Sequence, residues 1–482
     1  MKGRVDNWLT EEEIEQIHQA SLEILWERGM RIKHKRALEM LTGVGAKIDD
    51  QTGMVRFPPE LVESCLATVP AEIAIGSRGG KHDFLLGKNK IPYVRTSSGA
   101  EGYIDLKSRE YRMGTKDDLE EWARIVDGLE NVHFCGGHYP SDGPLHTRDV
   151  LAAKIIFSNT TKPLFINPYD LDTFKAIVEM AIAVQGSKEA LRQSPLLTIL
   201  TSATAPADIL DYCVDLIFYA GEHGIPVEIN SAPLMGGTAP VTIAGVVLQN
   251  NLEIMSLAVL SQLAHPGAPL LHRGITMFMD MSDGSGLIGT TECALAQVAA
   301  AQVVRSKYNY PVVSYGPISD AKLPDSQCQI ERTLQTLLAG ITGSQLLLAA
   351  GFIEALYSTD PVQLVIDNEI IGCLYRILRG VTLDDATLAK EVIKGTGPGG
   401  NYLTHNHTYE HFRQEHAIPR CFNRRSRSSW EEEGAKDMNQ LAAERAHSLL
   451  ENYDCEPLDE SLLKEFNGVF NAVTESKHAI NH

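Results

Sequence analysis

The sequence lacks paired cysteines, a signal peptide and a long apolar stretch. Its eight cysteines include no CxxC pair, which excludes a cysteine zinc knuckle and is typical of reduced thiols. The N-terminal residues lack the apolar core of a signal peptide, and no stretch of about 18 residues is uninterruptedly apolar. We therefore expect a cytoplasmic protein without a membrane anchor.

Positive charge is scarce as well. The chain has 43 lysines and arginines against 62 acidic residues, a formal net charge of −19, which argues against a nucleic-acid or anionic-membrane surface. One exception is residues 420–427, which hold four arginines and precede three consecutive glutamates at 431–433. Two interpretations stay open: pairing with those acids, or docking of an acidic or phosphate-bearing partner.

Motifs for nucleotide and sugar chemistry are also missing. No GxGxxG fingerprint follows the first strand, and the glycine-rich segment 395–400 lacks the Lys-Ser/Thr of a phosphate loop. No paired carboxylates stand at matched strand ends, which argues against glycoside hydrolysis.

A repeating pattern fills the middle of the chain. Short apolar runs alternate with helix-like windows, with about 30 to 45 residues between successive runs, and this alternation is typical of βαβ units. Eight repeats favour a closed TIM (β/α)8 barrel, in the α/β class, over an open doubly wound sheet. The predicted strands are Val132–Cys135, Pro163–Asn167, Pro195–Thr201, Pro226–Asn230, Ala268–Arg273, Pro311–Tyr315 and Phe352–Leu356, with Tyr93–Thr96 as the eighth.

Extensions flank the predicted barrel. Thr10 and Glu13 form a capping box that opens a first helix, and residues 102–106 and 110–112 read as a β-hairpin. We expect an N-terminal helical and β extension over 1–92, the barrel over 93–380, and a glycine/histidine segment with a C-terminal helical tail over 381–482.

The segment 395–413 combines a glycine turn with three histidines, His405, His407 and His411. Glycines allow close backbone approach to a ligand, and imidazoles serve in proton transfer and metal binding. Two interpretations remain open beside a ligand-binding role. A zinc-dependent barrel hydrolase would use the pair His405 and His407 with His138 and His272 at strand ends. Alternatively, the histidines hold the turn through hydrogen bonds.

Aromatic residues gather at or near the predicted strand ends and in the glycine segment. Ring faces attract a desolvated quaternary ammonium ion, which cannot donate a hydrogen bond. Arg273, or His272, is a candidate for binding a carboxylate on the same molecule. Glu228 is the acid expected to point into the barrel, with Arg273 as a plausible buried partner. The aromatic candidates are Tyr139, Phe165, Tyr169, Tyr315, Phe352, Tyr357 and Tyr402.

Three longer motifs are specific: residues 230–240 (NSAPLMGGTAP), 320–327 (DAKLPDSQ) and 397–405 (GPGGNYLTH). With them the chain resembles the trimethylamine methyltransferase family, the corrinoid-dependent methylamine and betaine methyltransferases. The resemblance runs over nearly the whole length. It implies a TIM barrel whose mouth receives a methylated amine on one side and the cobalamin of a small separate corrinoid protein on the other.

One departure bears on the substrate. The archaeal trimethylamine enzymes of this family carry pyrrolysine inside the barrel, whereas every position here is an ordinary amino acid. The chain therefore looks like the branch that demethylates quaternary amines such as glycine betaine. A quaternary ammonium ion that loses a methyl group leaves as a neutral amine, so no general acid is required.

The resemblance implies roles for particular residues. His405 and His407 would be catalytic residues at the mouth, and no bound metal is expected. A homodimer is possible, and the corrinoid would be carried by the partner protein. A betaine-binding protein without transfer activity is the non-enzymatic alternative. Substrate binding is assigned to Tyr139, Asn230, Arg273, Tyr315, Tyr357 and Tyr402, and contact with the corrinoid to Gly397, Gly399, Gly400 and Asn401.

Overall fold

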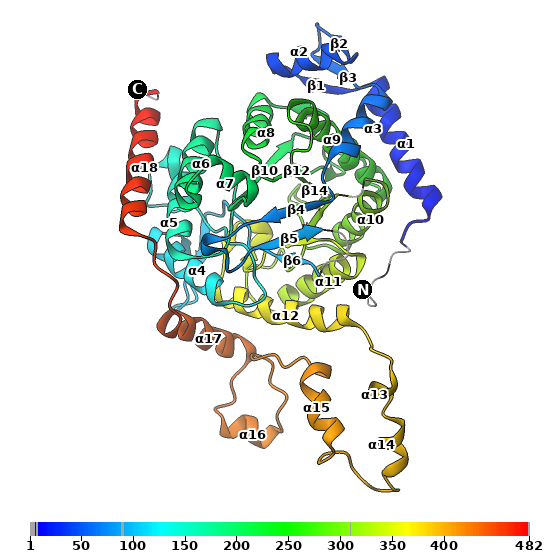
Figure 1. The fold of residues 1–482 in the computed structure, drawn as a ribbon, viewed down its shortest axis with the longest axis vertical. Helices are drawn as coiled ribbons and strands as arrows, with labels where there is room; N and C mark the ends of the chain where they lie inside the picture. Colours follow the sequence, from blue (N-terminus) through cyan, green and yellow to red (C-terminus); the bar gives the residue numbers. More distant parts are fainter. Residues whose placement is uncertain (1–4, 6–7, 88–90, 309, 481–482) are drawn as a thin grey trace.

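The computed structural model describes residues 5, 8–87, 91–308 and 310–480. Its centre is a closed parallel barrel surrounded by helices (Figure 1), so the predicted TIM barrel is confirmed. Seven strands follow the order β6, β18, β17, β14, β12, β10, β9. Residues Phe134 and Cys135 close the ring through parallel bridges to Arg95 and Leu164. The barrel strands are β6 Tyr93–Val94, β9 Leu164–Ile166, β10 Leu197–Ala203, β12 Val227–Ser231, β14 Leu270–Arg273, β17 Val312–Tyr315 and β18 Leu346–Leu348.

One helix follows each strand position around the barrel. Several begin at the side-chain caps that their sequences offer, such as Thr115 before α4 and Asp325 before α11. Because each helix returns the chain to the starting end of the next strand, all strand-to-helix loops meet at one end of the barrel, the mouth. The helices are α4 Lys116–Gly128, α5 Arg148–Asn159, α6 Leu171–Gln185, α8 Asp211–His223, α9 Ile243–Ala264, α10 Thr291–Lys307, α11 Ser326–Thr342 and α12 Pro361–Arg379.

The strand predicted at Phe352–Leu356 is wrong. The eighth barrel strand is β18, and the residues at 352–353 form β19 in a small sheet beside the mouth. Helix α11 ends at Thr342 because Gly343 takes a left-handed conformation, with φ of 87°. The following Leu346-Leu-Leu run is apolar on every residue, so periodicity alone could not separate a buried strand from a continuing helix.

In the N-terminal extension, the hairpin covers the end of the barrel opposite the mouth, whereas the preceding helices pack on the outside of α9, and residues 31–32 pair with residues 208–209 of a strand-to-helix loop. Hairpin strands β4 Glu72–Ile75 and β5 Phe84–Gly87 lie in front of the barrel in Figure 1. The Phe84 ring stacks on Tyr93, with ring centroids 4.1 Å apart, and meets Phe134 edge-on. The Thr10 capping box is confirmed at the start of α1. The other N-terminal elements are α1 Glu11–Glu27, β1 Met30–Ile32, α2 Lys35–Gly43, β2 Lys47–Asp49, β3 Met54–Arg56 and α3 Pro59–Thr68.

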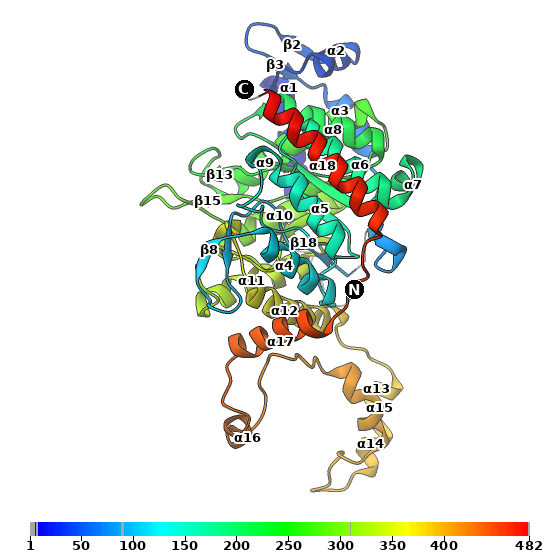
Figure 2. The ribbon, with the colours of Figure 1, turned by 90° about the vertical axis from the view of Figure 1, so that its left-hand side faces the viewer.

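Short β elements built from the strand-to-helix loops surround the mouth and project to the left in Figure 2. The predicted hairpin of residues 102–112 is confirmed as the antiparallel pair β7 and β8. These elements are β7 Gly102–Ile104, β8 Tyr111–Met113, β11 Asp208–Ile209, β13 Leu234–Met235, β15 Met277–Met279, β16 Gly286–Leu287, β19 Phe352–Ile353 and β20 Ser358–Thr359.

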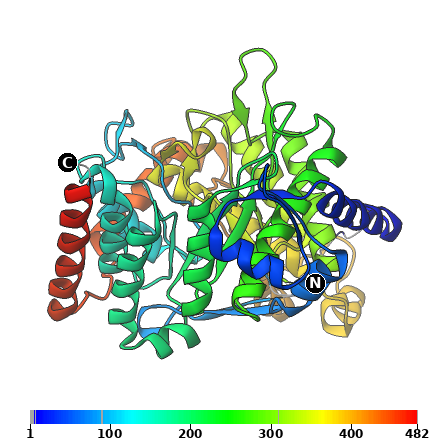
Figure 3. The same ribbon diagram turned by 90° about the horizontal axis from the view of Figure 1, so that it is seen from above.

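The C-terminal segment leaves the barrel after α12, runs outward and returns. Its last two helices pack on the barrel, α17 against α12 and α4, and α18 against α5 and α6. Seen from above, α18 and α1 flank the barrel on opposite sides (Figure 3). The division into three parts at residues 92 and 380 stays a prediction. The remaining helices are α7 Lys188–Gln193, α13 Asp385–Leu388, α14 Lys390–Gly395, α15 Asn406–Glu415, α16 Arg427–Glu432, α17 Met438–Asn452 and α18 Glu460–Ile480.

Helix α9 is long and apolar enough to cross a membrane by length and composition. However, 78% of its apolar window is buried inside the barrel protein. Buried helices of globular proteins are apolar all round for the same reason, so α9 is read as a core helix.

Candidate functional site

The floor of the barrel interior is a buried ion pair. Arg95 donates from Nε to Glu228 Oε1 at 2.8 Å and from Nη2 to Oε2 at 2.5 Å, and both side chains are fully buried. The Arg95 guanidinium also lies over the Phe165 ring, 3.4 Å from its centroid. Burial lowers the pKa of Arg95 to about 10, although the Glu228 carboxylate opposes that shift. The expected partner of Glu228 was Arg273, and this is corrected: the partner is Arg95.

Above this pair lies a second arginine without a counter-ion. Arg273 on β14 is 4% exposed, and in the described part of the chain it forms no ion pair. Its Nε has no hydrogen-bond partner there. The positive charge of Arg273 contributes to lowering the pKa of Arg95, so the two guanidinium groups interact. An uncompensated buried cation is costly, which makes Arg273 the strongest anion-binding candidate in the interior.

Asn230 and Tyr315 accompany Arg273. Asn230 pairs with Arg273 in the β12–β14 register, and its Nδ2 donates to Ser202 Oγ at 3.1 Å. Its Oδ1 is buried without a partner in the described residues. Tyr315, at the end of β17, is 3% exposed, and burial raises its pKa while the charge of Arg273 opposes the rise. The structure therefore brings together three of the six predicted substrate-binding residues.

Tyr139 lies on the opposite side of the mouth, at the end of the closing segment. Its hydroxyl donates to the Asn167 carbonyl at 2.5 Å, and its ring meets Tyr169 edge-on at 5.4 Å. Burial raises the pKa of Tyr139 well above its usual value, and the nearby Asp149 adds to the rise. Asp149 is itself buried, which raises its pKa to about 6. Tyr139 is thus a neutral, fixed ring at the mouth.

The mouth is covered in this structure. Arg273, Asn230, Tyr315 and Tyr139 are each between 3% and 6% exposed. Two mouth loops meet at Asp320, which accepts from the backbone N–H of Ile288 at 3.0 Å and of Gly289 at 2.8 Å. Burial raises the pKa of the Asp320 carboxyl. A ligand would reach the interior through movement of these loops.

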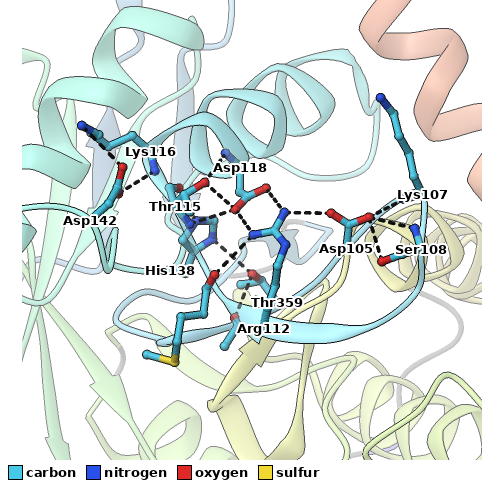
Figure 4. A network of polar contacts seen from close by, with 12 residues as sticks. Asp105, Lys107, Ser108, Arg112, Thr115, Lys116, Asp118, His138, Asp142 and Thr359 are labelled. Atoms are coloured by element: carbon cyan, nitrogen blue, oxygen red, sulfur yellow. Dashed lines mark hydrogen bonds and ion pairs between the residues drawn. The ribbon is translucent and has the colours of Figure 1, made fainter.

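His138 belongs to a polar network that fixes the β7–β8 hairpin beside the mouth (Figure 4). Its Nε2 lies 2.9 Å from the Thr115 carbonyl, and its Nδ1 lies 3.2 Å from Thr359 Oγ1. Arg112 joins the hairpin to α4 by donating to Asp118, and it also donates to Asp105 in the turn of the hairpin itself. Burial lowers the pKa of His138, so this histidine is a neutral structural residue with both ring nitrogens occupied.

The zinc arrangement weighed from the sequence does not form. His272 points out of the barrel toward the Tyr310 hydroxyl, 3.3 Å away, and burial lowers its pKa to about 3. Neither His138 nor His272 approaches the glycine segment. Across residues 5, 8–87, 91–308 and 310–480, no three His, Cys, Asp or Glu side chains gather as metal ligands.

The expected place of His405 and His407 at the mouth is wrong. Helix α12 carries the chain to the end of the barrel opposite the mouth, and the glycine/histidine segment leaves from there (Figure 2). His405 caps α15 by accepting from the backbone N–H of His407 at 3.0 Å, and His407 Nε2 lies 3.0 Å from the Ala386 carbonyl. The hydrogen-bonding interpretation therefore describes them. The predicted corrinoid-facing residues lie exposed in the same segment: Gly397, Gly399, Gly400 and Asn401.

Two predicted cage residues also lie outside the barrel interior. Tyr402 stands in the projecting segment, 43% exposed, because it precedes α15. Tyr357 lies on the outer rim of the mouth, 75% exposed, because β18 rather than the 352–356 segment enters the barrel. Their predicted places in a closed cage are corrected accordingly.

Tyr357 is part of an apolar ring on the rim. Large apolar side chains, each more than one third exposed, stand on six different strand-to-helix connections around the mouth. Exposed apolar side chains that stand around one end of a barrel are candidates for contact with a partner. The rim residues are Tyr111, Met113, Tyr169, Val241, Met281, Leu323 and Tyr357.

Sequence reasoning missed Arg95, Asp149 and Asp320 as parts of the site. Arg95 could have been found from the alternation of β6, since an arginine inside a predicted barrel strand needs an acid such as Glu228. Asp149 carries no comparable local signal, because the backbone N–H that it binds belongs to Tyr169 on another loop. Asp320 opens the 320–327 motif, but the motif does not indicate its contacts, because Ile288 and Gly289 lie on a different loop.

Comparison with known proteins now adds the family. The chain matches the family described as "Trimethylamine methyltransferase (MTTB)" over residues 3–474. It is 32% identical over 477 residues to trimethylamine methyltransferase MttB of Desulfitobacterium hafniense (strain DSM 10664 / DCB-2), covering 98% of this chain and 94% of that protein. It is 29% identical over 456 residues to glycine betaine methyltransferase of Desulfitobacterium hafniense (strain Y51), covering 94% of each.

A solved structure gives the same fold. The monomethylamine methyltransferase MtmB of Methanosarcina barkeri superposes with a TM-score of 0.52 at 12% identity, over 94% of this chain and 90% of that one. At 12% identity, this match supports the fold and not the function. Together with the full-length family match, the barrel and its mouth identify this chain as a member of the trimethylamine methyltransferase family, a family of methyltransferases.

Proposed function

We propose that this protein moves a methyl group from a carboxylated quaternary amine, of the glycine betaine type, to the Co(I) of a corrinoid held by a small partner protein. The observation that carries the substrate class is Arg273, a buried guanidinium that pairs with no acid in the described residues. A substrate carboxylate would supply the missing charge through two parallel hydrogen bonds. Asn230 Oδ1 and the Tyr315 ring lie beside it to orient the rest of the molecule.

The ammonium end of the substrate requires aromatic ring faces around it and no competing hydrogen-bond donors. Tyr315 and Tyr139 both keep neutral phenols, since burial raises the pKa of each. Their rings could attract the N-methyl groups with roughly 0.5 to 2 kcal/mol each. The attraction must stay modest, because the positive charge disappears as the methyl group departs.

The protein does not need to protonate the leaving group. A quaternary amine leaves neutral, and the interior matches this requirement: Glu228 is tied to Arg95 on both oxygens. The chain's own task is then to align the carbon–nitrogen bond with the mouth and to exclude water. The covered mouth and the loop contacts at Asp320 support this task.

The apolar rim fits a corrinoid carrier. A Co(I) corrinoid, when bound, supplies the nucleophile that accepts the methyl group. The exposed rim side chains from Tyr111 to Tyr357 offer apolar contacts around the mouth, the end of the barrel at which β14 and β17 finish with Arg273 and Tyr315. No side chain of the rim is assigned a chemical step.

The test is loss of Co(I) absorbance on mixing the protein with a corrinoid and one amine at a time. We expect turnover with glycine betaine and little with trimethylamine or choline. Met281→Asp with Tyr357→Asp should slow transfer to the corrinoid protein and spare transfer to free cob(I)alamin. Absence of turnover with every amine, despite tight betaine binding, would support the betaine-binding alternative instead.

A further inference from the structure

The C-terminal segment contains a projecting part, residues 381–419, which we call the arm. Helices α13, α14 and α15 of the arm lie well outside the barrel in Figures 1 and 2. Helices this short are marginal on their own in water. The arm nevertheless exposes large apolar side chains, with Leu403 and Tyr409 both 82% exposed. Its other exposed apolar residues include Leu383, Ile393 and Ile418.

The arm is fastened to its own barrel at its return end. Near its return, Glu415 accepts from Arg376 of α12 at 2.7 Å. Directly after the arm, the Arg420 backbone N–H donates to Glu369 of α12 at 2.6 Å, and Cys421 is buried. The arm is therefore a loop held at its base, and its two most exposed apolar residues, Leu403 and Tyr409, lie away from that attachment.

The same chain offers a second uncovered apolar surface. On helix α11, Ile330 is 61% exposed and Leu334, one turn further, is 46% exposed. Helix α11 packs against α12, the helix that carries the arm. We call Ile330 and Leu334 the α11 face. Two unpartnered apolar surfaces on one chain are what a self-complementary, twofold interface needs.

We propose that the arm lies across the α11 face of a second copy of this chain, so that two copies exchange arms. The apolar character favours a permanent partner, since permanent interfaces are more apolar than transient ones. Under the proposed function a corrinoid protein docks at the mouth, whereas the arm leaves the opposite end of the barrel. The arm also holds only five acids and three bases, so two copies of this strongly acidic chain meet there with little repulsion.

The experiment is native mass by light scattering after size-exclusion chromatography, across a range of micromolar concentrations. The full chain should show an even multiple of 52.9 kDa. Leu403→Asp with Tyr409→Asp should reduce that mass to a monomer, and Ile330→Asp with Leu334→Asp should do the same. The matched control is Leu145→Asp, an exposed leucine next to α18, which should leave the mass unchanged.

Thermal unfolding of each variant shows whether it folds, and Leu403→Ser with Tyr409→Ser provides a milder pair if the aspartates interfere. A monomeric full chain overturns the proposal. So does an arm variant that is folded and keeps the native mass. An unchanged mass for the α11 variant overturns the α11 face as the seat of the arm.

Discussion

Replacing Arg273 with methionine should separate ligand binding from folding. The guanidinium is buried and has no acid partner in the described residues. If a substrate carboxylate is its partner, truncation removes one side of a buried charge pair and costs about 2 to 5 kcal/mol of binding. The dissociation constant for glycine betaine should therefore rise at least about 30-fold. Folding should not suffer, because an apolar side chain of similar size replaces an uncompensated charge.

Arg95→Met is the matched control, since it removes the neighbouring buried arginine. Glu228 would then be left charged and unpaired inside the barrel, at a cost of about 3 to 5 kcal/mol of stability. We expect Arg95→Met to lower the melting temperature by several degrees and Arg273→Met to leave it equal or higher. The changes in melting temperature of the two variants thus differ in sign, although both variants lose a buried arginine.

The assay is titration calorimetry with glycine betaine, joined to thermal unfolding with and without the ligand. Saturating ligand at 100 times its dissociation constant stabilises the wild type by about 2.7 kcal/mol, and this gain should vanish in Arg273→Met. Unchanged betaine affinity in Arg273→Met would refute the carboxylate assignment. A loss of stability as large as that of Arg95→Met would instead show that Arg273 has a structural partner.

Three further outcomes are expected. Tyr315→Leu should weaken betaine binding by about 0.5 to 2 kcal/mol while Tyr315→Phe keeps it, because the ring face is the binding element; equal affinities in calorimetry would remove Tyr315 from the cage. Burial raises the pKa of Asp149 to about 6. The stability that its protonated carboxyl contributes is therefore fully present below about pH 4 and is lost as the pH rises through 6. Asp149→Asn should therefore gain up to about 3 kcal/mol over wild type above pH 6 and little near pH 4, and a melting-temperature difference independent of pH would contradict this. His407→Ala should leave methyl transfer unchanged, since His407 bonds the Ala386 carbonyl away from the mouth, and a large rate loss would return it to the site.

The barrel could be predicted because its signal is local and repeated. Runs such as 163–167 and 226–230 are short, apolar and separated by amphipathic helices, and both became barrel strands. The eighth strand failed because three consecutive leucines at 346–348 fit helix and strand equally well. The same pattern of runs placed Asn230 and Arg273 at the carboxyl ends of two predicted strands, and the structure has them there, opposite each other in the register.

The rest of the site depends on contacts that no local pattern contains. Which arginine meets Glu228 is decided across the barrel, between β6 and β12. The histidine segment was misplaced for a different reason: its position at the mouth came from the family resemblance and not from chain direction. A segment that follows the helix of a βα unit starts at the end of the barrel opposite the mouth, and that rule alone would have moved His405 and His407 away.

Net charge inside the barrel bears most directly on the substrate. Arg95 and Glu228 cancel as an ion pair, whereas Arg273 forms no ion pair among the described residues. A trimethylammonium or choline cation bound roughly 6 Å from that guanidinium would be repelled by about 3 kcal/mol at an effective dielectric constant of 20. A betaine is also an ammonium ion, but it brings its own carboxylate, which compensates Arg273 at the same time. The interior therefore selects a zwitterion over a cation, and the ratio of betaine to choline affinity should fall by at least about tenfold in Arg273→Met. An unchanged ratio would mean that the unpaired guanidinium does not discriminate between the two amines.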